Sequence, residues 1–239
     1  MFDVFIGWDP REMEVADVCR HSILTRTDNS KIRVHYIKLS DMREKGLYTR
    51  SVEVRDGRLW DPISDSSMST EFAISRFLVK FLADSDWAVF CDCDFLWRVD
   101  IRELEEYFSP KHAISCVKHS HIPDENVKMD NQLQLRYARK NWSSLMVWNC
   151  RHPANERLTL DMLNTLPGRD LHAFNWLEDD EIGEMPVEYN WLEGISDKSV
   201  TPKVVHYTRG GPWFEDYQDV DYAADWLKER AQLEQEQKS

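Results

Sequence analysis

The stretch WAVFCDCDF at residues 87–95 decides the fold. It begins as an apolar run, which is typical of a buried strand, and ends with two aspartates separated by one residue. Because side chains alternate between the two faces of a strand, Asp92 and Asp94 are expected to point together from one face. The other face would be apolar and would consist of Val89, Cys91, Cys93 and Phe95. Ligands of open α/β sheets bind at the carboxyl ends of strands, so the sequence predicts an acidic site at residues 92–94.

A divalent cation is the economical explanation for this pair of acids. Two unpaired carboxylates at a buried strand end repel each other and resist desolvation, and a cation removes both penalties. The alternative is that both aspartates belong to a turn or cap the helix expected from Ile101. Zinc is not favoured, because Cys91 and Cys93 have no second cysteine pair nearby at ligand spacing.

A third candidate ligand, His206, follows the apolar run at 203–205 and precedes a loop with two glycines. An imidazole together with two carboxylates suits Mn²⁺, and suits Mg²⁺ less well. A histidine at the end of such a run is more often a core residue, and the paired aspartates shift the interpretation towards a ligand. We therefore predict a Mn²⁺ (or Mg²⁺) site formed by Asp92, Asp94 and His206.

The rest of the chain alternates between strand and helix patterns. Further strands are expected at 2–8, 33–39, 113–118, 144–149 and 203–207, and helices at 12–24, 70–84, 101–108 and 155–166. This alternation predicts an α/β fold, with one Rossmann-like domain over residues 1–239 and a mostly parallel central sheet covered by helices on both faces. The polar segment 43–69 is expected to be an irregular insert or short hairpin, and residues 222–239 a charged C-terminal helix that frays.

Composition narrows the possible partners and compartments. The 239 residues include 43 acidic and 30 basic side chains, and the net charge of −13 works against non-specific attraction to nucleic acid or anionic lipid. Five cysteines form no evenly spaced framework, which predicts reduced thiols in a cytoplasmic protein. No run approaches the roughly 20 apolar residues of a membrane span, and no charged leader opens the sequence. We expect no integral membrane segment.

Five segments resemble, in order and spacing, the family 8 glycosyltransferases and their bacterial relatives. They are STEFAISRF (69–77), VFCDCDF (89–95), NWSSLMVWN (141–149), DLHAFNWL (170–177) and VVHYTRGGPW (204–213). The resemblance covers residues 2–214 and implies a GT-A fold. In that family the D-x-D motif and a late histidine hold Mn²⁺ against the diphosphate of a nucleotide sugar. It therefore implies a metal-dependent glycosyltransferase that moves a sugar from a nucleoside diphosphate sugar, first of all a UDP-sugar, to an acceptor hydroxyl with retention of configuration.

The resemblance also implies further donor-binding positions. Base and ribose contacts fall on Gly7, Trp8 and Asp9, contacts with the donor on Arg76, and contacts with the donor sugar on Asn141, Ser143 and Ser144. The glycines of the last motif, Gly210 and Gly211, would let the main chain approach the ligand closely. From the residues alone, Asp9 is equally a helix cap, Arg76 a solvated helix residue and the 141–144 segment a polar loop.

Catalytic roles are implied for Asp94, Asp170, His172 and Arg209, and sugar binding for Asn175. The family reads D-Q-D-x-L-N where this chain has Leu171 and His172 in place of the glutamine and the second aspartate. The last motif lacks the lysine of the family, and Arg209 can replace it as a diphosphate clamp at a different offset. The alternative for Arg209 is a solvated loop residue.

Three other functions remain to be separated from this one. A nucleotidyltransferase is disfavoured, because no Gly-rich basic phosphate loop follows the first strand. A catalytically silent sugar-nucleotide-binding protein fits the departures at residues 171 and 172. For the acceptor we rank a surface or lipopolysaccharide glycan first and hydroxymethylated phage DNA second, because a locally basic stretch carries Lys118, His119, His121, Lys128, Arg136, Arg139 and Lys140. The sequence indicates neither the sugar nor the oligomeric state.

Overall fold

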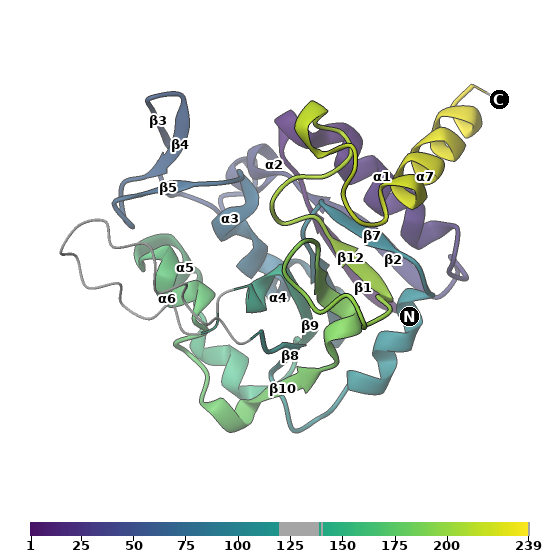
Figure 1. Ribbon diagram of the computed structural model, residues 1–239. Coiled ribbons are helices and arrows are strands. Elements are labelled where there is room, and N and C mark those ends of the chain that lie inside the picture. The colour runs from purple at the N-terminus through teal and green to yellow at the C-terminus, as the bar shows by residue number, and fades with distance from the viewer. Residues whose placement is uncertain (120–138, 140, 239) are drawn as a thin grey trace.

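A central sheet organises the protein in the computed structural model, which describes residues 1–119, 139 and 141–238. Within these residues the sheet has six strands in the order β10-β8-β9-β6-β1-β2 (Figure 1). Their bounds are β1 Phe2–Gly7, β2 Ile32–Ile37, β6 Trp87–Cys91, β8 Ile114–Val117, β9 Leu145–Asn149 and β10 Ile182–Met185. Strand β1 pairs in parallel with β2 and β6, and β10 pairs in parallel with β8, whereas β9 runs antiparallel to both its neighbours. The sheet is therefore mostly parallel, as predicted.

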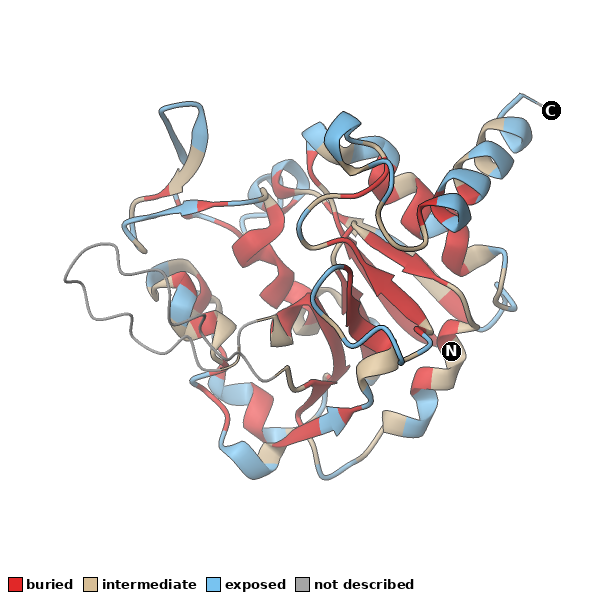
Figure 2. Cartoon of the chain, viewed as in Figure 1, coloured by how far each residue is buried: buried red, intermediate tan, exposed pale blue. Residues whose placement is uncertain are grey.

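Both faces of this sheet are covered. Every residue of β1, β8 and β9 is buried, and because successive side chains point to opposite faces, burial along a whole strand requires cover on both sides (Figure 2). Helix α1 (Met13–Leu24) packs against β1, and α4 (Val79–Leu82) packs against β6 and β9. The remaining α-helices are α2 Leu39–Glu44, α3 Phe72–Ser75, α5 Leu160–Thr165, α6 Gly168–His172 and α7 Ala223–Glu236.

Several expected helices are shorter or tighter than their sequence period indicates. The helix expected at 70–84 is divided into α3, the 3-10 turn η2 (Arg76–Leu78) and α4, and residues 72–79 are all buried, so packing overrides the regular period. The helix expected at 101–108 is the 3-10 helix η3 (Ile101–Tyr107), and the one expected at 155–166 is split between η5 and α5. The other 3-10 turns are η1 Pro10–Glu12, η4 Trp142–Ser144, η5 Pro153–Arg157, η6 Asp179–Glu181, η7 Val187–Asn190 and η8 Glu215–Tyr217.

The strand predicted at residues 87–95 ends early. Strand β6 stops at Cys91, residues 93 and 94 form a turn, and the chain resumes as β7 (Phe95–Trp97) in a second sheet. That sheet has the order β11-β12-β7, with β11 at Trp191–Leu192 and β12 at Val204–His206. The prediction that Asp92 and Asp94 share one strand face is wrong, because a turn between two sheets brings them together instead.

Segment 43–69 is more regular than expected. Strands β3 (Glu53–Arg55), β4 (Arg58–Asp61) and β5 (Ser66–Met68) form a small antiparallel sheet that projects from the body (Figure 1). Buried Arg50 anchors it, since its guanidinium pairs with Asp61 and donates hydrogen bonds to the carbonyls of Leu163 and Leu166 at 2.8 and 2.6 Å. A buried ion pair with further hydrogen bonds compensates the cost of desolvating both charges.

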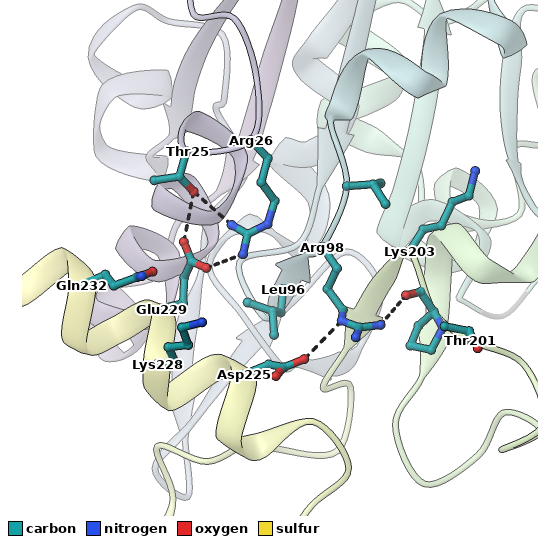
Figure 3. Close-up of a pocket in the computed structure, with 12 residues that line it drawn as sticks. Thr25, Arg26, Leu96, Arg98, Thr201, Lys203, Asp225, Lys228, Glu229 and Gln232 are labelled. Atoms are coloured by element: carbon teal, nitrogen blue, oxygen red, sulfur yellow. Dashed lines mark hydrogen bonds and ion pairs between the residues drawn. The ribbon is translucent and has the colours of Figure 1, made fainter.

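Helix α7 forms where a charged C-terminal helix is expected, and its first turns pack against α1. Trp226 is buried in a second apolar cluster with Val18, Leu96, Trp191, Val205 and Tyr207. Buried Glu229 accepts hydrogen bonds from Arg26 at 2.7 Å and Thr25 at 3.2 Å (Figure 3). This cluster joins α7 to strand β12, which carries His206.

All five cysteines are free, and all except Cys150 are buried. In the part of the chain that the structure describes, no helix is both long enough and apolar enough to cross a bilayer.

Replacing Trp226 tests the role of α7. Trp226→Ala should lower the free energy of unfolding by about 3–5 kcal/mol, because it leaves a cavity in a packed cluster. The matched control is Leu227→Ala, one residue further along the same helix, where the side chain is 42% exposed. That change should stay within about 0.5 kcal/mol in urea denaturation. An effect of Trp226→Ala as small as that expected for Leu227→Ala would show that burial of Trp226 does not stabilise the fold.

Candidate active site

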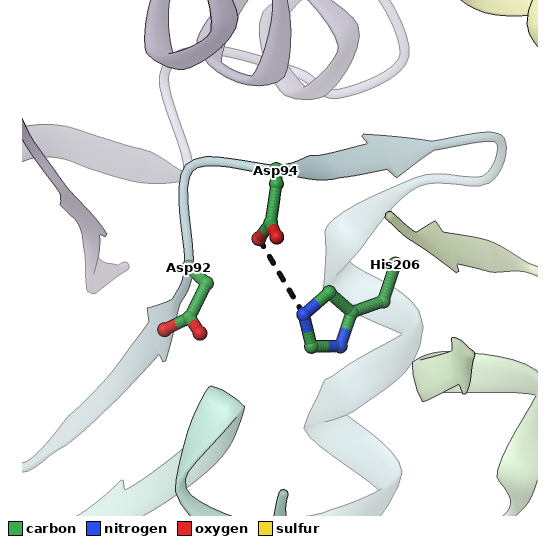
Figure 4. A group of neighbouring side chains, drawn as sticks. All are labelled: Asp92, Asp94 and His206. Atoms are coloured by element: carbon green, nitrogen blue, oxygen red, sulfur yellow. Dashed lines mark ion pairs between the residues drawn. The ribbon is translucent and has the colours of Figure 1, made fainter. Parts of the chain in front are cut away.

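Asp92, Asp94 and His206 converge, as the sequence predicts, although the strand geometry differs from the prediction (Figure 4). One ligand atom from each residue lies within 4.8 Å of the other two. The main chain fixes this arrangement, because Asp92 N donates to Ser144 O at 3.0 Å and Tyr207 N donates to Asp94 O at 3.0 Å. The three side chains therefore come from the end of β6, the following turn and the end of β12.

The imidazole of His206 is oriented for a cation. Its Nδ1 lies 2.9 Å from Asn190 Oδ1, and Asn190 Nδ2 donates to Ser144 Oγ at 2.9 Å, which fixes the amide so that its oxygen faces the ring. The amide oxygen can only accept, so in the neutral form of the ring Nδ1 carries the proton and Nε2 keeps its lone pair. Nε2 lies 3.5 Å from Asp94 Oδ1, and the ring stacks on Phe95. A hydrogen bond to the far nitrogen is the usual support of a metal-binding histidine.

The carboxylates also fit a cation. Oδ1 of Asp92 and Oδ1 of Asp94 are buried atoms without a hydrogen bond. Asp92 Oδ1 also lies 2.8 Å from a guanidinium nitrogen of Arg76, with which it forms an ion pair. Two buried, incompletely satisfied oxygens beside an available imidazole lone pair form a donor set that suits a divalent cation such as Mn²⁺.

Arg76 is buried beside Asp92 and connects it to neighbouring segments. Its guanidinium donates to Ser143 O at 3.0 Å and to Ala73 O at 3.1 Å and lies against the rings of Phe72 and Phe90. Burial raises the pKa of Asp92 to about 7; Asp94 adds to this shift, whereas Arg76 and His206 oppose it. Arg76 is thus a buried positioning residue and not the solvated helix arginine of the alternative interpretation.

A cleft of about 260 Å³ opens onto the three residues. Six of the residues singled out in the sequence line it: Arg76, Asp92, Asp94, His206, Arg209 and Gly210. The other candidate residues do not line the described part of this cleft: Gly7, Trp8, Asp9, Asn141, Ser143, Ser144, Asp170, His172, Asn175 and Gly211.

Residues 141–144 and His172 form a hydrogen-bonded group that contacts Arg76, a residue of the cleft wall. Asn141 has a left-handed backbone with φ of 64°, and its carbonyl accepts a hydrogen bond from Ser144 Oγ at 2.7 Å. Ser143 Oγ lies 2.7 Å from Nδ1 of His172. Burial, together with the charge of Arg76, lowers the pKa of His172 to about 3, so its imidazole is neutral at pH 7. These side chains couple the 170–175 segment to the carbonyl that holds Arg76.

The turn after β1 has a structural role in this structure. Gly7 has no room for a Cβ atom, because the ring of Phe72 occupies that space. Burial raises the pKa of Asp9, but hydrogen bonds from Arg11 and from the main chain of Glu71 outweigh it, and the net pKa is lowered. Asp9 caps η1, so the capping interpretation holds for this residue. The ring of Trp8 lies under the ammonium group of Lys38.

Among the remaining motif residues, Asn175 and Arg209 form hydrogen bonds with acidic side chains, and the two glycines lie in tight surroundings. Asn175 Nδ2 donates to Asp170 Oδ1 at 3.3 Å. Arg209 is half exposed at the cleft and donates to the buried carboxylate of Glu193 at 3.1 Å. Gly210 has φ of 117°, which disfavours other residues there, and Gly211 lies directly under the ring of Trp213.

Two residues near Asp94 and His206 carry no sequence signal of their own. Asn190, which orients His206, lies in a 3-10 turn outside every motif. Glu12 lines the cleft and accepts a hydrogen bond from Cys93 Sγ at 3.4 Å, and burial together with the charge of Asp94 raises its pKa. Glu12 begins an expected helix, where an acid is ordinary, so only the fold reveals its proximity to Asp94.

Only part of the basic stretch can be placed. His121, Lys128, Arg136 and Lys140 lie outside the described residues. Lys118 and Arg139 lie against the ring of Trp142, and Arg139 pairs with Asp179. Burial and the proximity of His206 lower the pKa of His119 to about 4, so its ring is uncharged at pH 7. The described part of this stretch therefore offers little free positive charge.

Comparison with known proteins places the chain in a family. No family model matches it. Protein CDI of Arabidopsis thaliana is 45% identical over 243 residues, an alignment that covers 99% of this chain and 89% of that protein. The chain belongs to the Protein CDI family. Membership of the CDI family does not itself state a reaction.

Solved structures show which fold this member of the CDI family has. The bifunctional glycosyltransferase WbbM superposes with a TM-score of 0.63 at 14% identity, and GlyE of Streptococcus pneumoniae TIGR4 with 0.60 at 13%. The galactosyltransferase LgtC, solved with donor and acceptor sugar analogues, gives 0.57 at 11%. Each alignment covers 96% of this chain, but 49% of WbbM, 60% of GlyE and 95% of LgtC. The chain therefore has the GT-A fold and spans about half the length of the WbbM chain.

The pKa of Asp92 makes cation binding depend on pH. A cation must displace the proton that the carboxyl group carries below its pKa of about 7. Mn²⁺ affinity should therefore fall about 10-fold from pH 8 to pH 6, which isothermal titration calorimetry measures. The fall should persist in His206→Ala and become smaller in Asp92→Asn. A pH-independent affinity in the parent protein would show that Asp92 is not a ligand.

Proposed function

We propose that this protein is a metal-dependent glycosyltransferase that moves a sugar from a nucleoside diphosphate sugar to an acceptor hydroxyl. The observation that carries the proposal is the convergence of Asp92, Asp94 and the available Nε2 of His206 in one cleft. The GT-A fold supports it, because the cleft opens at the carboxyl end of β6, where open α/β sheets bind ligands. The resemblance of the five sequence segments to family 8 favours a UDP-sugar as donor.

A bound Mn²⁺ or Mg²⁺ would neutralise the negative charge that develops on the departing nucleoside diphosphate. This charge accounts for a large part of the activation barrier in such reactions. Asn190 keeps His206 in the tautomer that binds a cation. Arg76 holds Asp92 and the carbonyl of Ser143 in place. These contacts position the site before a ligand arrives, so little reorganisation is needed during the reaction.

Arg209 can act directly on the diphosphate. It lines the cleft, and a guanidinium pairs well with two phosphate oxygens. Its present partner is the carboxylate of Glu193, which the diphosphate would have to share or replace. The family 8 resemblance implies catalytic roles for Asp170 and His172, but neither lines the cleft. The neutral ring of His172 contacts Ser143, so we propose that His172 positions the 141–144 segment.

The reaction joins the acceptor oxygen to the anomeric carbon of the donor. The bond between that carbon and the diphosphate oxygen breaks, and the diphosphate keeps the electron pair. The proton of the acceptor hydroxyl passes to water. The family 8 resemblance favours retention of configuration at the anomeric carbon, and a glycan ranks first as the acceptor.

A screen of nucleotide sugars with Mn²⁺ tests this function. We expect release of nucleoside diphosphate, with UDP-sugars turned over best. Asp94→Asn should abolish the metal-dependent activity, because it keeps the size of the side chain but loses the charge that holds the cation. His206→Ala should weaken Mn²⁺ binding by about 10-fold or more, as expected for a lost ligand.

Circular dichroism and urea denaturation provide the control that both variants fold. A chelator should mimic the substitutions in the parent protein, and Mn²⁺ should restore activity there alone. Full turnover after chelation, or in Asp94→Asn, would contradict a metal-dependent mechanism. Donor binding with no turnover of any nucleotide sugar would identify a silent sugar-nucleotide-binding protein instead.

A further inference from the structure

An exposed aromatic residue is among those that line the cleft. Phe214 is 46% exposed and is the one aromatic residue among the exposed large apolar residues of the described chain. Its ring lines the same cleft as Asp92, Asp94 and His206. An isolated exposed apolar residue is ordinary, but this one borders the proposed site of transfer.

The position of Phe214 is fixed by its neighbours. Its ring centroid lies 5.7 Å from that of Trp213 and 6.3 Å from that of Tyr217, and its main-chain N–H donates to Gly211 O at 2.9 Å. Trp213 in turn contacts buried Trp226 of α7 at 5.2 Å between centroids. The exposed face of Phe214 is therefore prearranged, which lowers the entropy cost of binding against it.

The charge around this ring is negative. Glu215 and Asp216 follow it directly and are exposed. With Glu193, Asp219 and Asp221 they line an adjoining cavity of about 400 Å³, which Tyr217 also borders. The nearby cations are already paired, Lys198 with Asp221 at 2.8 Å and Arg209 with Glu193. Such a surface repels polyanions, whereas its carboxylates can accept hydrogen bonds from hydroxyl groups.

We propose that Phe214 is the acceptor platform of this enzyme and that the acceptor is an uncharged glycan. The C–H face of a pyranose ring would stack on the exposed face of Phe214, and its hydroxyl groups would donate to the carboxylates of Glu215 and Asp216. The inference rests on the proposed glycosyl transfer and deepens it, because it selects a neutral carbohydrate over nucleic acid. An aromatic face supplies affinity for such a ring, and acidic neighbours supply selectivity against polyanionic acceptors such as nucleic acid.

Saturation-transfer NMR tests this binding without catalysis. The probes are neutral methyl pyranosides (gluco, galacto, manno and xylo), trigalacturonate as a matched anionic saccharide, and a DNA oligonucleotide, each with UDP and Mg²⁺ present. At least one neutral pyranoside should bind the parent protein through its ring C–H protons. Phe214→Ala should weaken that binding 10-fold or more, whereas Phe214→Trp should retain it. Trigalacturonate and DNA should bind more weakly than the neutral probe.

Leu227→Ala is the matched control, because it removes another exposed apolar side chain that does not line the cleft. It should bind the probes like the parent. The inference is overturned if Phe214→Ala binds as well as the parent, if trigalacturonate or DNA binds best, or if no neutral pyranoside binds. Donor turnover without acceptor, measured separately in the parent protein, distinguishes the two proposals. Its absence in the parent would count against the proposed transfer and not against the binding platform.

Discussion

The turn at residues 92–94 is the constraint on which the site depends. The central sheet ends there and the second sheet begins, and the main-chain bonds from Asp92 to Ser144 and from Tyr207 to Asp94 fix the two sides. Strand β6 pairs with β9, and β7 pairs with β12 in the other sheet. A single strand that continued through Phe95 could not make both pairings. The change of sheet brings the carboxylates beside His206, whose strand pairs with β7.

Neighbouring groups partly offset the free-energy cost of burying the two aspartates of this turn. Burial alone would make two adjacent carboxylates very costly. Arg76 lies against Asp92, and the pKa of Asp92 rises to about 7, so the carboxyl group can carry a proton when no cation is present. Cation binding at the proposed site would therefore release a proton from Asp92, while Asn190 orients the ring of His206.

The sequence predicted the elements and the grouping of Asp92, Asp94 and His206 better than their geometry. The apolar run before Asp92 marks a buried strand in any context, so the α/β fold and the position of the acids followed from local pattern. The turn at Cys93 was missed, because the alternating pattern of residues 91–95 satisfies a continuous strand equally well. Asn190 and Glu12 were missed for a different reason. Their roles depend on tertiary neighbours far along the chain, and neither residue type nor spacing records such contacts.

Other motif residues proved to have structural roles that their sequence context left open. Asp9 caps a 3-10 turn, and Gly7 makes room for the ring of Phe72. Arg76, in contrast, turns inward from a segment whose helical period is broken by η2. These outcomes share one cause: in a fully buried segment, packing decides which way a side chain points, and local propensity does not.

The central claim is that Asp92, Asp94 and His206 bind one cation. A crystal grown with Mn²⁺ and UDP, examined by anomalous diffraction at the manganese edge, tests it most directly. The account predicts one anomalous peak within about 2.0–2.5 Å of a carboxylate oxygen of each aspartate and of Nε2 of His206, while Nδ1 stays bonded to Asn190. A crystal that binds Mn²⁺ elsewhere but shows no peak between these three residues would contradict it.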